Sequence, residues 1–241
     1  MIRFFVTPQE LTGRFHTLTG ENAKHAKVLR LKIGEEVLLC DGQGMECLCT
    51  LEDPDKLTLA LGECRKCESE ASVKVSVYMA FPKAEKLEHV IQKATELGAA
   101  EIIAFPSERC VSRPDEKSIQ KKLERWRKIA ASAAEQSGRG VIPEVLVLGS
   151  YGEALTRAAQ AEKAILFYEH EDTVTLHQAL EQGPWSTVSL LTGPEGGLEE
   201  REVAKALEAG LTVCTLGRRI LRCETAPLCA LSAVMYAAGE Y

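Results

Sequence analysis

Short runs of alternating hydrophobic and polar residues dominate the first 70 positions and predict strands rather than helices. Residues 41–44 (Asp-Gly-Gln-Gly) predict a tight hairpin turn, and residues 22–31 form one helical pattern. The charged run at residues 63–70 predicts a linker. This region is therefore expected to form a small, mostly antiparallel barrel or sandwich. The predicted strands cover residues 2–6, 36–40, 45–51 and 56–61.

After residue 70 the pattern changes to strands that alternate with helices. Apolar residues recur at helical spacing between Leu87 and Leu97, where Gly98 follows as a C-terminal cap, and along a long helix around Trp126. The chain closes with a helix from about 225 to 238. This alternation predicts an α/β domain whose parallel sheet is covered on both faces. The predicted strands cover residues 73–79, 101–105, 145–148, 164–168, 188–192 and 211–216.

A glycine-rich loop follows the strand at 188–192, where parallel sheets bind ligands. Residues 193–197 (Gly-Pro-Glu-Gly-Gly) allow positive φ angles and close approach of a ligand to the backbone. A tight strand-to-helix connection without a ligand is the plain alternative. A phosphate loop fits poorly, because no Gly-Lys-Ser/Thr or G-x-G-x-x-G pattern is present and Glu195, Glu199, Glu200 and Glu202 crowd the helix start. The loop favours a ligand that is neutral or cationic where it meets the backbone.

An arginine-rich loop follows the strand at 211–216. Arg218, Arg219 and Arg222 lie within five positions, and Ile220 and Leu221 between them would form an apolar floor. A solvated basic turn is the plain alternative. An aliphatic pair among arginines is unusual in such a turn, which favours a binding loop.

Composition and charge narrow the class of protein. The 241 residues are 45% hydrophobic and 27% charged, which excludes disorder, collagen and coiled coil. The net charge of −6 excludes a uniformly basic coat for nucleic acid but not local basic patches. The longest apolar stretch, 228–238, is too short for a membrane span, and the first residues lack a secretory signal, so we expect a cytoplasmic protein.

Nine cysteines are present, and most lie in apolar patterns, as small hydrophobic residues do in a reducing compartment. Cys47, Cys49, Cys64 and Cys67 together could bind zinc. No second Cys-x-x-Cys accompanies Cys64 and Cys67, so free thiols are favoured and no metal is expected.

Two segments carry local positive charge. Residues 109–128 contain eight Lys/Arg against three Asp/Glu, a net charge of +5, and residues 20–32 contain four against one. Such faces are usually solvated surface. Two of them in one chain with a ligand loop favour a track for phosphates.

The two loops resemble those of the RsmE-type ribosomal RNA methyltransferases of the SPOUT superfamily. The resemblance is carried by residues 193–197 and by residues 216–226 (Leu-Gly-Arg-Arg-Ile-Leu-Arg-Cys-Glu-Thr-Ala), and it extends to residues 25–34, 81–98 and 135–143. It covers essentially the whole chain. Gly140 departs from the family pattern, which has a larger residue after Arg139.

The resemblance implies a PUA-like β-barrel RNA-binding domain over residues 1–70 and a SPOUT methyltransferase domain over 71–241, with a C-terminal trefoil knot that holds S-adenosyl-L-methionine. The implied reaction is methylation of N3 of a specific uridine in 16S ribosomal RNA, in the assembled small ribosomal subunit. The implied assembly is a homodimer. Leu228, Leu231, Val234 and Met235 would suit its interface, although ordinary core explains them equally well.

Roles for individual residues follow from the motifs and the local charge. Arg222 is expected to stabilise the anion that develops on the uracil, and Glu224 is the nearest carboxylate for proton removal, although helix capping explains Glu224 equally well. The expected cofactor contacts are Leu191, Thr192, Gly193, Glu195, Gly196, Gly197, Leu216, Gly217, Ile220, Leu221, Arg222, Thr225 and Ala226. The expected RNA contacts are Arg3, Lys24, His25, Arg30, Lys83, Arg109, Arg113 and Arg139.

Two other functions remain open from the sequence. A ribosome assembly factor without catalysis would keep the basic segments but would need no intact cofactor loop. A nucleotide-binding enzyme would need phosphate ligands, and the motifs that supply them are missing.

Overall fold

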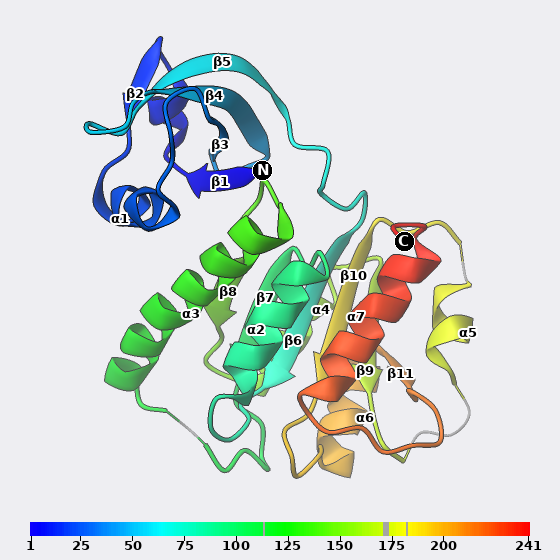
Figure 1. Ribbon diagram of the computed structural model, residues 1–241. Coiled ribbons are helices and arrows are strands. Elements are labelled where there is room, and N and C mark those ends of the chain that lie inside the picture. Colours follow the sequence, from blue (N-terminus) through cyan, green and yellow to red (C-terminus); the bar gives the residue numbers. More distant parts are fainter. Residues whose placement is uncertain (113, 171–173, 182) are drawn as a thin grey trace. The chain divides into compact units, whose positions relative to one another are not determined.

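The chain folds into two compact units, which we describe separately. The computed structural model describes residues 1–112, 114–170, 174–181 and 183–241 (Figure 1). The first unit contains Met1–Glu70 and Ala131–Ile142, and the second contains Ala71–Ala130 and Pro143–Tyr241. Residues 131–142 therefore belong to the first unit, whereas the sequence predicted a single domain boundary, at residue 70.

The first unit is built on a five-stranded sheet with the order β1-β3-β4-β5-β2. β1 pairs with β3 in parallel and the other pairs are antiparallel. Alternate residues of the strands point to one side, where Phe4, Val37, Leu39, Leu51 and Leu59 are fully buried. Its elements are β1 (Ile2–Phe5), a 3-10 helix (Pro8–Leu11), β2 (Phe15–Thr17), α1 (Gly20–Leu29), β3 (Glu36–Cys40), β4 (Met45–Asp53) and β5 (Thr58–Lys66).

Three arginines of the first unit form ion pairs. Arg3 and Arg139 are largely buried, whereas the Arg65 side chain is 63% exposed. Arg3 Nη1 donates to Glu46 Oε2 at 2.7 Å, and Arg65 Nε donates to the other Glu46 oxygen at 2.9 Å. Burial alone would raise the pKa of Glu46, but the hydrogen bonds from Arg3 and Arg65 hold it below its ordinary value. Arg139 Nη2 donates to Glu70 Oε2 at 2.7 Å. These buried charges are paired, as burial of a guanidinium or carboxylate requires.

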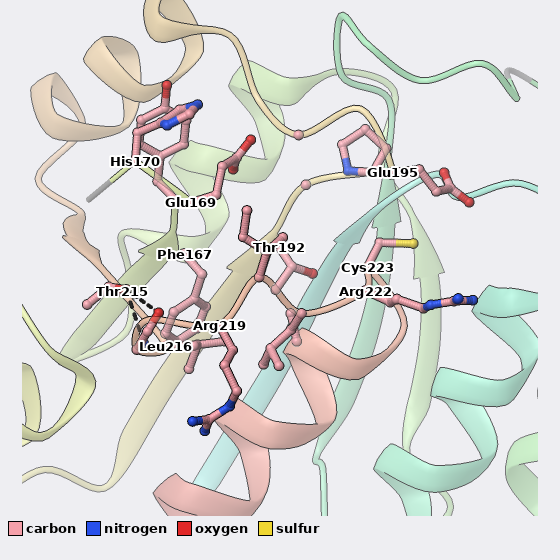
Figure 2. A pocket seen from close by; sticks show the side chains of 18 of the residues that line it. Phe167, Glu169, His170, Thr192, Glu195, Thr215, Leu216, Arg219, Arg222 and Cys223 are labelled. Atoms are coloured by element: carbon pink, nitrogen blue, oxygen red, sulfur yellow. Dashed lines mark hydrogen bonds between the residues drawn. The ribbon is translucent and has the colours of Figure 1, made fainter. Parts of the chain in front are cut away.

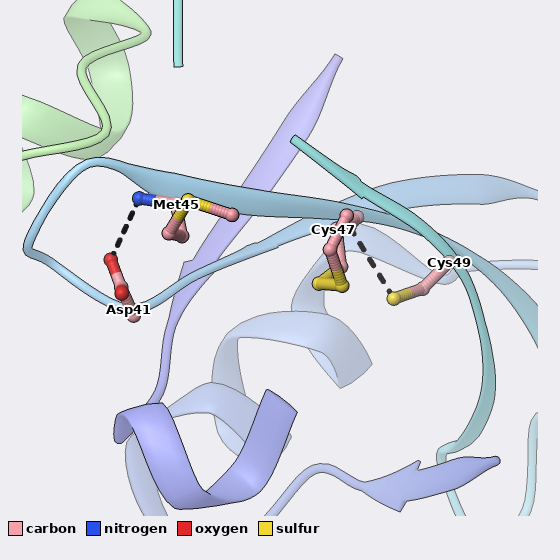
Figure 3. The surroundings of a disulfide bond; sticks show 5 residues. Asp41, Met45, Cys47 and Cys49 are labelled. Atoms are coloured by element: carbon pink, nitrogen blue, oxygen red, sulfur yellow. Dashed lines mark hydrogen bonds between the residues drawn. A yellow bond between two sulfur atoms is a disulfide. The ribbon is translucent and has the colours of Figure 1, made fainter. Parts of the chain in front are cut away.

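The cysteines of this unit correct one prediction. Cys47 and Cys64, which the sequence favoured as free thiols, are joined in a disulfide between β4 and β5 (Figure 3). The antiparallel register places the two residues directly opposite each other, a proximity that their separation of 17 positions does not reveal. Cys49 donates its thiol to the Cys47 carbonyl at 3.4 Å.

The predicted linker at residues 63–70 is also wrong in its first half. β5 continues to Lys66, and its last residues pair with the start of β4. Charged side chains mislead here because one face of an antiparallel sheet can be exposed to water and carry polar residues. β2 is a further strand that the sequence pattern missed.

The second unit is a six-stranded parallel sheet with the order β11-β9-β10-β6-β7-β8. Its strands are β6 (Lys74–Ala80), β7 (Glu101–Phe105), β8 (Glu144–Val147), β9 (Lys163–Phe167), β10 (Thr187–Thr192) and β11 (Thr212–Cys214). The central strands are almost continuously apolar and buried, because helices cover both faces of the sheet. Together with the β-sheet unit, this confirms the predicted fold class.

Helices α2 and α7 lie side by side on one face of this sheet, where α7 packs on β6 and β10 (Figure 1). The α3 helix begins in the second unit, and its last residues belong to the first. None of the helices in the described residues is long and apolar enough to span a membrane. The helices are α2 (Lys86–Glu96), α3 (Glu116–Ser137), α4 (Tyr151–Ala158), α5 (Leu176–Leu180), α6 (Glu200–Glu208) and α7 (Thr225–Ala237).

Of the two interpretations that the sequence left open for the apolar residues of α7, ordinary core holds for three of the four. Leu231 and Val234 are fully buried and Met235 is 1% exposed, because α7 packs between the sheet, α2 and α5. Only Leu228 of the four is half-buried. A helix that is apolar on most sides belongs to a core, so its apolar residues alone do not mark an interface.

Candidate active site

The glycine loop and the arginine loop leave the same edge of the parallel sheet. The glycine loop runs from the end of β10 at Thr192 to the start of α6, and the arginine loop runs from the end of β11 to the start of α7. β9 lies between β10 and β11 in the sheet. Because α7 packs on β10 and β6, the arginine loop must pass the carboxyl ends of β9 and β10 to reach it.

This crossing encloses a pocket of about 1090 Å³. Figure 2 shows Glu169 and His170 on one side of it and Glu195, Arg222 and Cys223 on the other, with Thr192 between them. The pocket is therefore assembled from the ends of three adjacent strands, as ligand sites of open parallel sheets are. Its lining residues include Lys86, Phe167, Tyr168, Glu169, His170, Thr175, Thr192, Gly193, Pro194, Glu195, Gly197, Thr215, Leu216, Gly217, Arg218, Arg219, Ile220, Leu221, Arg222, Cys223 and Ala226.

Tight packing explains the glycines of the first loop. A Cβ atom at Gly193 would lie 3.1 Å from Leu198 Cγ and 3.2 Å from the Gly197 carbonyl carbon. Gly197 has a φ of +67°, and a Cβ there would overlap the Glu169 carboxylate. The loop is closed by a hydrogen bond from Gly197 N to the Pro194 carbonyl at 3.0 Å. These glycines bring the backbone to the pocket wall without side chains in between.

The arginine loop turns at Gly217, whose φ is +98°. Thr215 Oγ1 accepts a hydrogen bond from Gly217 N at 3.1 Å and holds the turn. Arg219 and Arg222 are exposed, and their side chains leave the loop in different directions (Figure 2). Ile220 is 85% exposed, so the expected apolar floor consists of the half-buried Leu221 alone.

Lys86, the first residue of α2, lies between the two loops. Its Nζ is 3.1 Å from Glu195 Oε1 and 3.1 Å from Glu224 Oε2. The Glu195 oxygen also accepts a hydrogen bond from Lys83 N at 3.0 Å, and the Cys223 thiol donates to Glu224 Oε2 at 3.2 Å. One ammonium group thus joins the carboxylates of both loops.

These contacts determine the charge states in this part of the site. Hydrogen bonds to Glu195 and Glu224 raise the pKa of Lys86. Burial alone would raise the pKa of both carboxyl groups, but bonds from backbone N–H groups and Lys86 hold each below its ordinary value. Burial, together with the bond to Glu224, raises the pKa of Cys223 to about 12. At neutral pH the site holds an ammonium, two carboxylates and a neutral thiol.

Most of the expected cofactor contacts line the pocket, but three do not. Leu191 is fully buried inside β10. Gly196 faces Arg109, because a Cβ there would lie 3.1 Å from Arg109 Cβ. Thr225 is exposed at the start of α7. Glu224, the expected proton acceptor, is not among the lining residues and is bound by Lys86.

The sequence missed the contribution of β9. Phe167, the last residue of β9, and residues 168–170 after it line the pocket, together with Thr175 and Lys86. No motif marks these residues. Knowledge that β9 lies between β10 and β11 would have identified them, and strand order is not readable from hydrophobic pattern.

The expected RNA contacts lie in different environments. Arg30 and Lys83 are exposed, and Lys24 is exposed and paired with Glu21 at 2.7 Å. Arg109 Nη1 donates to the Gly196 carbonyl at 3.0 Å. Arg113 lies outside the described residues.

Three further expected RNA contacts are engaged within the first unit. The His25 ring packs edge-on against Phe4, and its Nδ1 lies 3.9 Å from a Glu135 oxygen. The side chains of Arg3 and Arg139 are only 13% and 5% exposed and are bound to carboxylates. Their guanidinium groups serve the fold, so we withdraw Arg3 and Arg139 as RNA contacts.

The described residues contain no group of three or more His, Cys, Asp or Glu side chains that could hold a metal ion. The exclusion of a metal site in the whole protein stays a prediction.

Comparisons with known proteins agree with this architecture. Residues 69–235 match the family model of the RNA methyltransferase domain, and residues 18–63 match that of the RNA methyltransferase PUA domain. The chain is 38% identical to Ribosomal RNA small subunit methyltransferase E of Bacillus subtilis, with 98% of this chain and 96% of that protein covered. It is 33% identical to the protein of the same name from Synechocystis, with 96% and 76% covered.

A solved structure has the same fold along almost the whole chain. Ribosomal RNA small subunit methyltransferase E of Neisseria gonorrhoeae, bound to S-adenosyl methionine, superposes with a TM-score of 0.86 at 31% identity, with 98% of each chain covered. Both domains of the family, in the same order, are thus present here. The chain therefore belongs to the RNA methyltransferase family that its loop motifs predict.

Proposed function

We propose that this protein transfers a methyl group from S-adenosyl-L-methionine to N3 of a specific uridine in 16S ribosomal RNA of the small subunit. One observation carries the proposal. Arg218, Arg219 and Arg222 stand exposed around a glycine-lined pocket, and within the described residues none of them is bound to a carboxylate. The names of the Bacillus and Neisseria relatives support ribosomal RNA as substrate, and the Neisseria complex supports the cofactor.

The pocket suits this cofactor better than a nucleotide phosphate. S-adenosyl-L-methionine carries a sulfonium cation and no phosphate, and when bound it supplies an electrophilic methyl group. The Glu169 carboxylate lies against Gly197, so the wall formed by the glycine loop would favour a cation over a pyrophosphate. Lys86, Arg218, Arg219 and Arg222 also line the pocket, and Lys86 is paired with Glu195. The backbone of Gly193, Gly197 and Leu216 would hold the adenosine and methionine parts.

Arg222 is the residue that we assign to the reaction itself. N3 of uridine gives its proton to solvent water before or during methylation, and negative charge spreads to the neighbouring oxygens. A guanidinium beside these oxygens would stabilise that charge as it develops. Alignment of N3 with the methyl group would supply much of the remaining rate enhancement.

RNA binding is proposed for the exposed basic residues Lys24, Arg30, Lys83 and Arg109. Each is positively charged and accessible to solvent. Contacts with phosphates would make the affinity strongly dependent on salt.

Several properties of the family extend the proposal. Residue 70 would separate the RNA-binding domain from the methyltransferase domain. The path of the arginine loop would complete a trefoil knot, and the active form would be a homodimer that acts in the cytoplasm on the assembled small subunit.

Calorimetry and methylation mapping test the proposal together. The protein should bind S-adenosyl-L-methionine and not ATP, and mass spectrometry should locate a new methyl group on N3 of one uridine in 16S ribosomal RNA. Ala226→Leu, which fills the pocket from the first turn of α7, should abolish cofactor binding. Ala159→Leu, at the exposed end of α4, is the matched control and should bind normally.

The two rival functions give different results. A noncatalytic assembly factor would bind ribosomal RNA without binding the cofactor. A nucleotide-binding enzyme would bind ATP. Either result in the folded wild-type protein would overturn the proposal.

A further inference from the structure

Lys86 forms ion pairs with residues far away in the sequence, unlike most ion-paired lysines of this chain. Lys24, Lys56 and Lys93 each pair with an acidic residue three positions away, within one turn of chain. Lys86 starts α2, yet its two partners are Glu195 in the glycine loop and Glu224 before α7. Three segments that are far apart in sequence thus meet at one nitrogen.

The arrangement depends on the cation. Glu195 Oε1 and Glu224 Oε2 can be no more than about 6.2 Å apart, because each lies 3.1 Å from the same Nζ atom. Without Lys86 the two carboxylates would repel each other and tend to separate. Glu224 lies two residues after Arg222, so such a movement would carry the proposed reactive arginine with it.

The contacts of Glu224 also limit its chemistry. Its Oε2 atom receives the Lys86 ammonium and the Cys223 thiol, and its pKa is below the ordinary value. A carboxylate that is stabilised in its charged form is a weak proton acceptor. The contact with Lys86 instead allows Glu224 to hold the arginine loop in place.

We propose that Lys86 is a positioning residue that ties the glycine loop to the arginine loop and so places Arg222 at the pocket, with Glu224 as its anchor rather than as a general base. This inference rests on the proposed function for its effect on methylation. The tie between the two loops can be tested without any ligand.

The first measurement is hydrogen exchange of the protein alone. Lys86→Met should accelerate exchange in residues 193–199 and 215–224, about tenfold relative to wild type. Lys86→Arg should restore slow exchange, because it keeps the charge. Lys93→Met removes a lysine of the same helix that, among the described residues, pairs only with Glu96, and it should leave both loops unchanged.

The second measurement is the affinity for S-adenosyl-L-methionine and single-turnover methylation at saturating cofactor and RNA. Lys86→Met and Glu224→Gln should each weaken cofactor binding about tenfold and slow methylation at saturation. The double variant should be no worse than Lys86→Met alone, because both changes break one tie. Glu195→Gln tests the other partner if Lys86→Met does not fold.

Two results would overturn the inference. In the first, the loops of Lys86→Met and Glu195→Gln exchange as slowly as those of wild type. In the second, Glu224→Gln loses turnover more than a hundredfold while cofactor affinity and the turnover of Lys86→Met stay normal, which would identify Glu224 as the base. If Lys86→Met accelerates exchange in both loops but the wild-type protein does not methylate RNA, the proposed function is refuted. The link between the two loops through Lys86 then remains supported.

Discussion

Two arginines of the first unit and three of the second have opposite roles. In the first unit, the side chains of Arg3 and Arg139 are almost completely buried and bound to Glu46 and Glu70. In the second unit, Arg218, Arg219 and Arg222 are exposed at a pocket and, within the described residues, bound to no carboxylate. The same side chain stabilises the fold in one unit and remains available to a ligand in the other.

The difference follows from the energy of desolvation. A buried guanidinium must have a carboxylate partner, and removal of that partner leaves an uncompensated charge. An exposed guanidinium has no such requirement and can give its donors to a phosphate or to a base. Substitutions in these buried pairs of the first unit should therefore affect stability, whereas substitutions around the pocket should affect catalysis or binding.

The largest effect is expected for Arg222→Met, which keeps the side-chain length but removes the charge and the donors. Single-turnover methylation at saturating RNA and cofactor should slow on the order of a hundredfold or more, because the interaction grows only as the uracil anion forms. RNA affinity, measured by filter binding, should fall much less. A rate within a few-fold of wild type would demote Arg222 to a binding residue.

A stability effect is expected for Glu46→Gln in the first unit. At pH 7 it should lower the free energy of unfolding by about 1–3 kcal/mol, since Arg3 and Arg65 lose their charged partner. Because the pKa of Glu46 is lower in the folded state, its contribution is complete above its ordinary value of 4.5 and disappears as the pH falls through the folded-state value.

Urea unfolding of the wild type and of Glu46→Gln at several pH values measures this contribution. The difference between the two proteins should shrink on acidification below pH 4.5. Glu52→Gln, on an exposed position of the same strand, should unfold like wild type at every pH. A constant difference across the pH range would contradict the role of the Glu46 charge.

A smaller effect is expected for Arg30→Glu at the end of α1. RNA binding at low salt should weaken about tenfold, and the slope of log affinity against log salt should flatten, while cofactor affinity stays unchanged. Lys56→Glu makes the same charge change in another exposed turn of the first unit and should have little effect. Equal RNA affinities for Arg30→Glu and wild type would remove α1 from the RNA path.

The smallest effect is expected for Gly217→Ala in the arginine loop. No atom lies within 4 Å of the added Cβ, so the change introduces only backbone strain of about 1 kcal/mol at a φ of +98°. Gly210→Ala is the matched control for this change. Gly210 has a φ of +88° and no atom within 4 Å of an added Cβ, but it does not line the pocket. Both variants should lose similar stability, and calorimetry should show weaker cofactor binding for Gly217→Ala alone.

Hydrophobic periodicity and loop motifs predicted much of this molecule. The strand at Glu101–Phe105 and the start of α7 were predicted at their observed positions, because β strands and helices differ clearly in apolar spacing. The glycine and arginine loops were identified as one site because both follow strands of one parallel sheet. Ten of the predicted cofactor contacts line the pocket, whereas three do not.

The errors concern relations between distant residues. Strand order and register bring together Lys86 with Glu195 and Glu224. They also bring together the two cysteines of the disulfide, Cys47 and Cys64. Neither is encoded in a local pattern. The burial of Arg139 was missed for the same reason, because its partner Glu70 lies in a segment that looked like a charged linker.

The assignment of residues 131–142 to the first unit has a consequence for protein synthesis. Glu70 accepts hydrogen bonds from Gly140 N at 2.9 Å and from Val141 N at 3.0 Å, so the first unit is complete only after these residues are made. A ribosome adds about 5–20 residues per second, and the intervening stretch therefore takes roughly 4–14 s. During that interval the β-sheet unit exists without its last segment, and a nascent chain released between residues 70 and 139 lacks the arginine that neutralises Glu70.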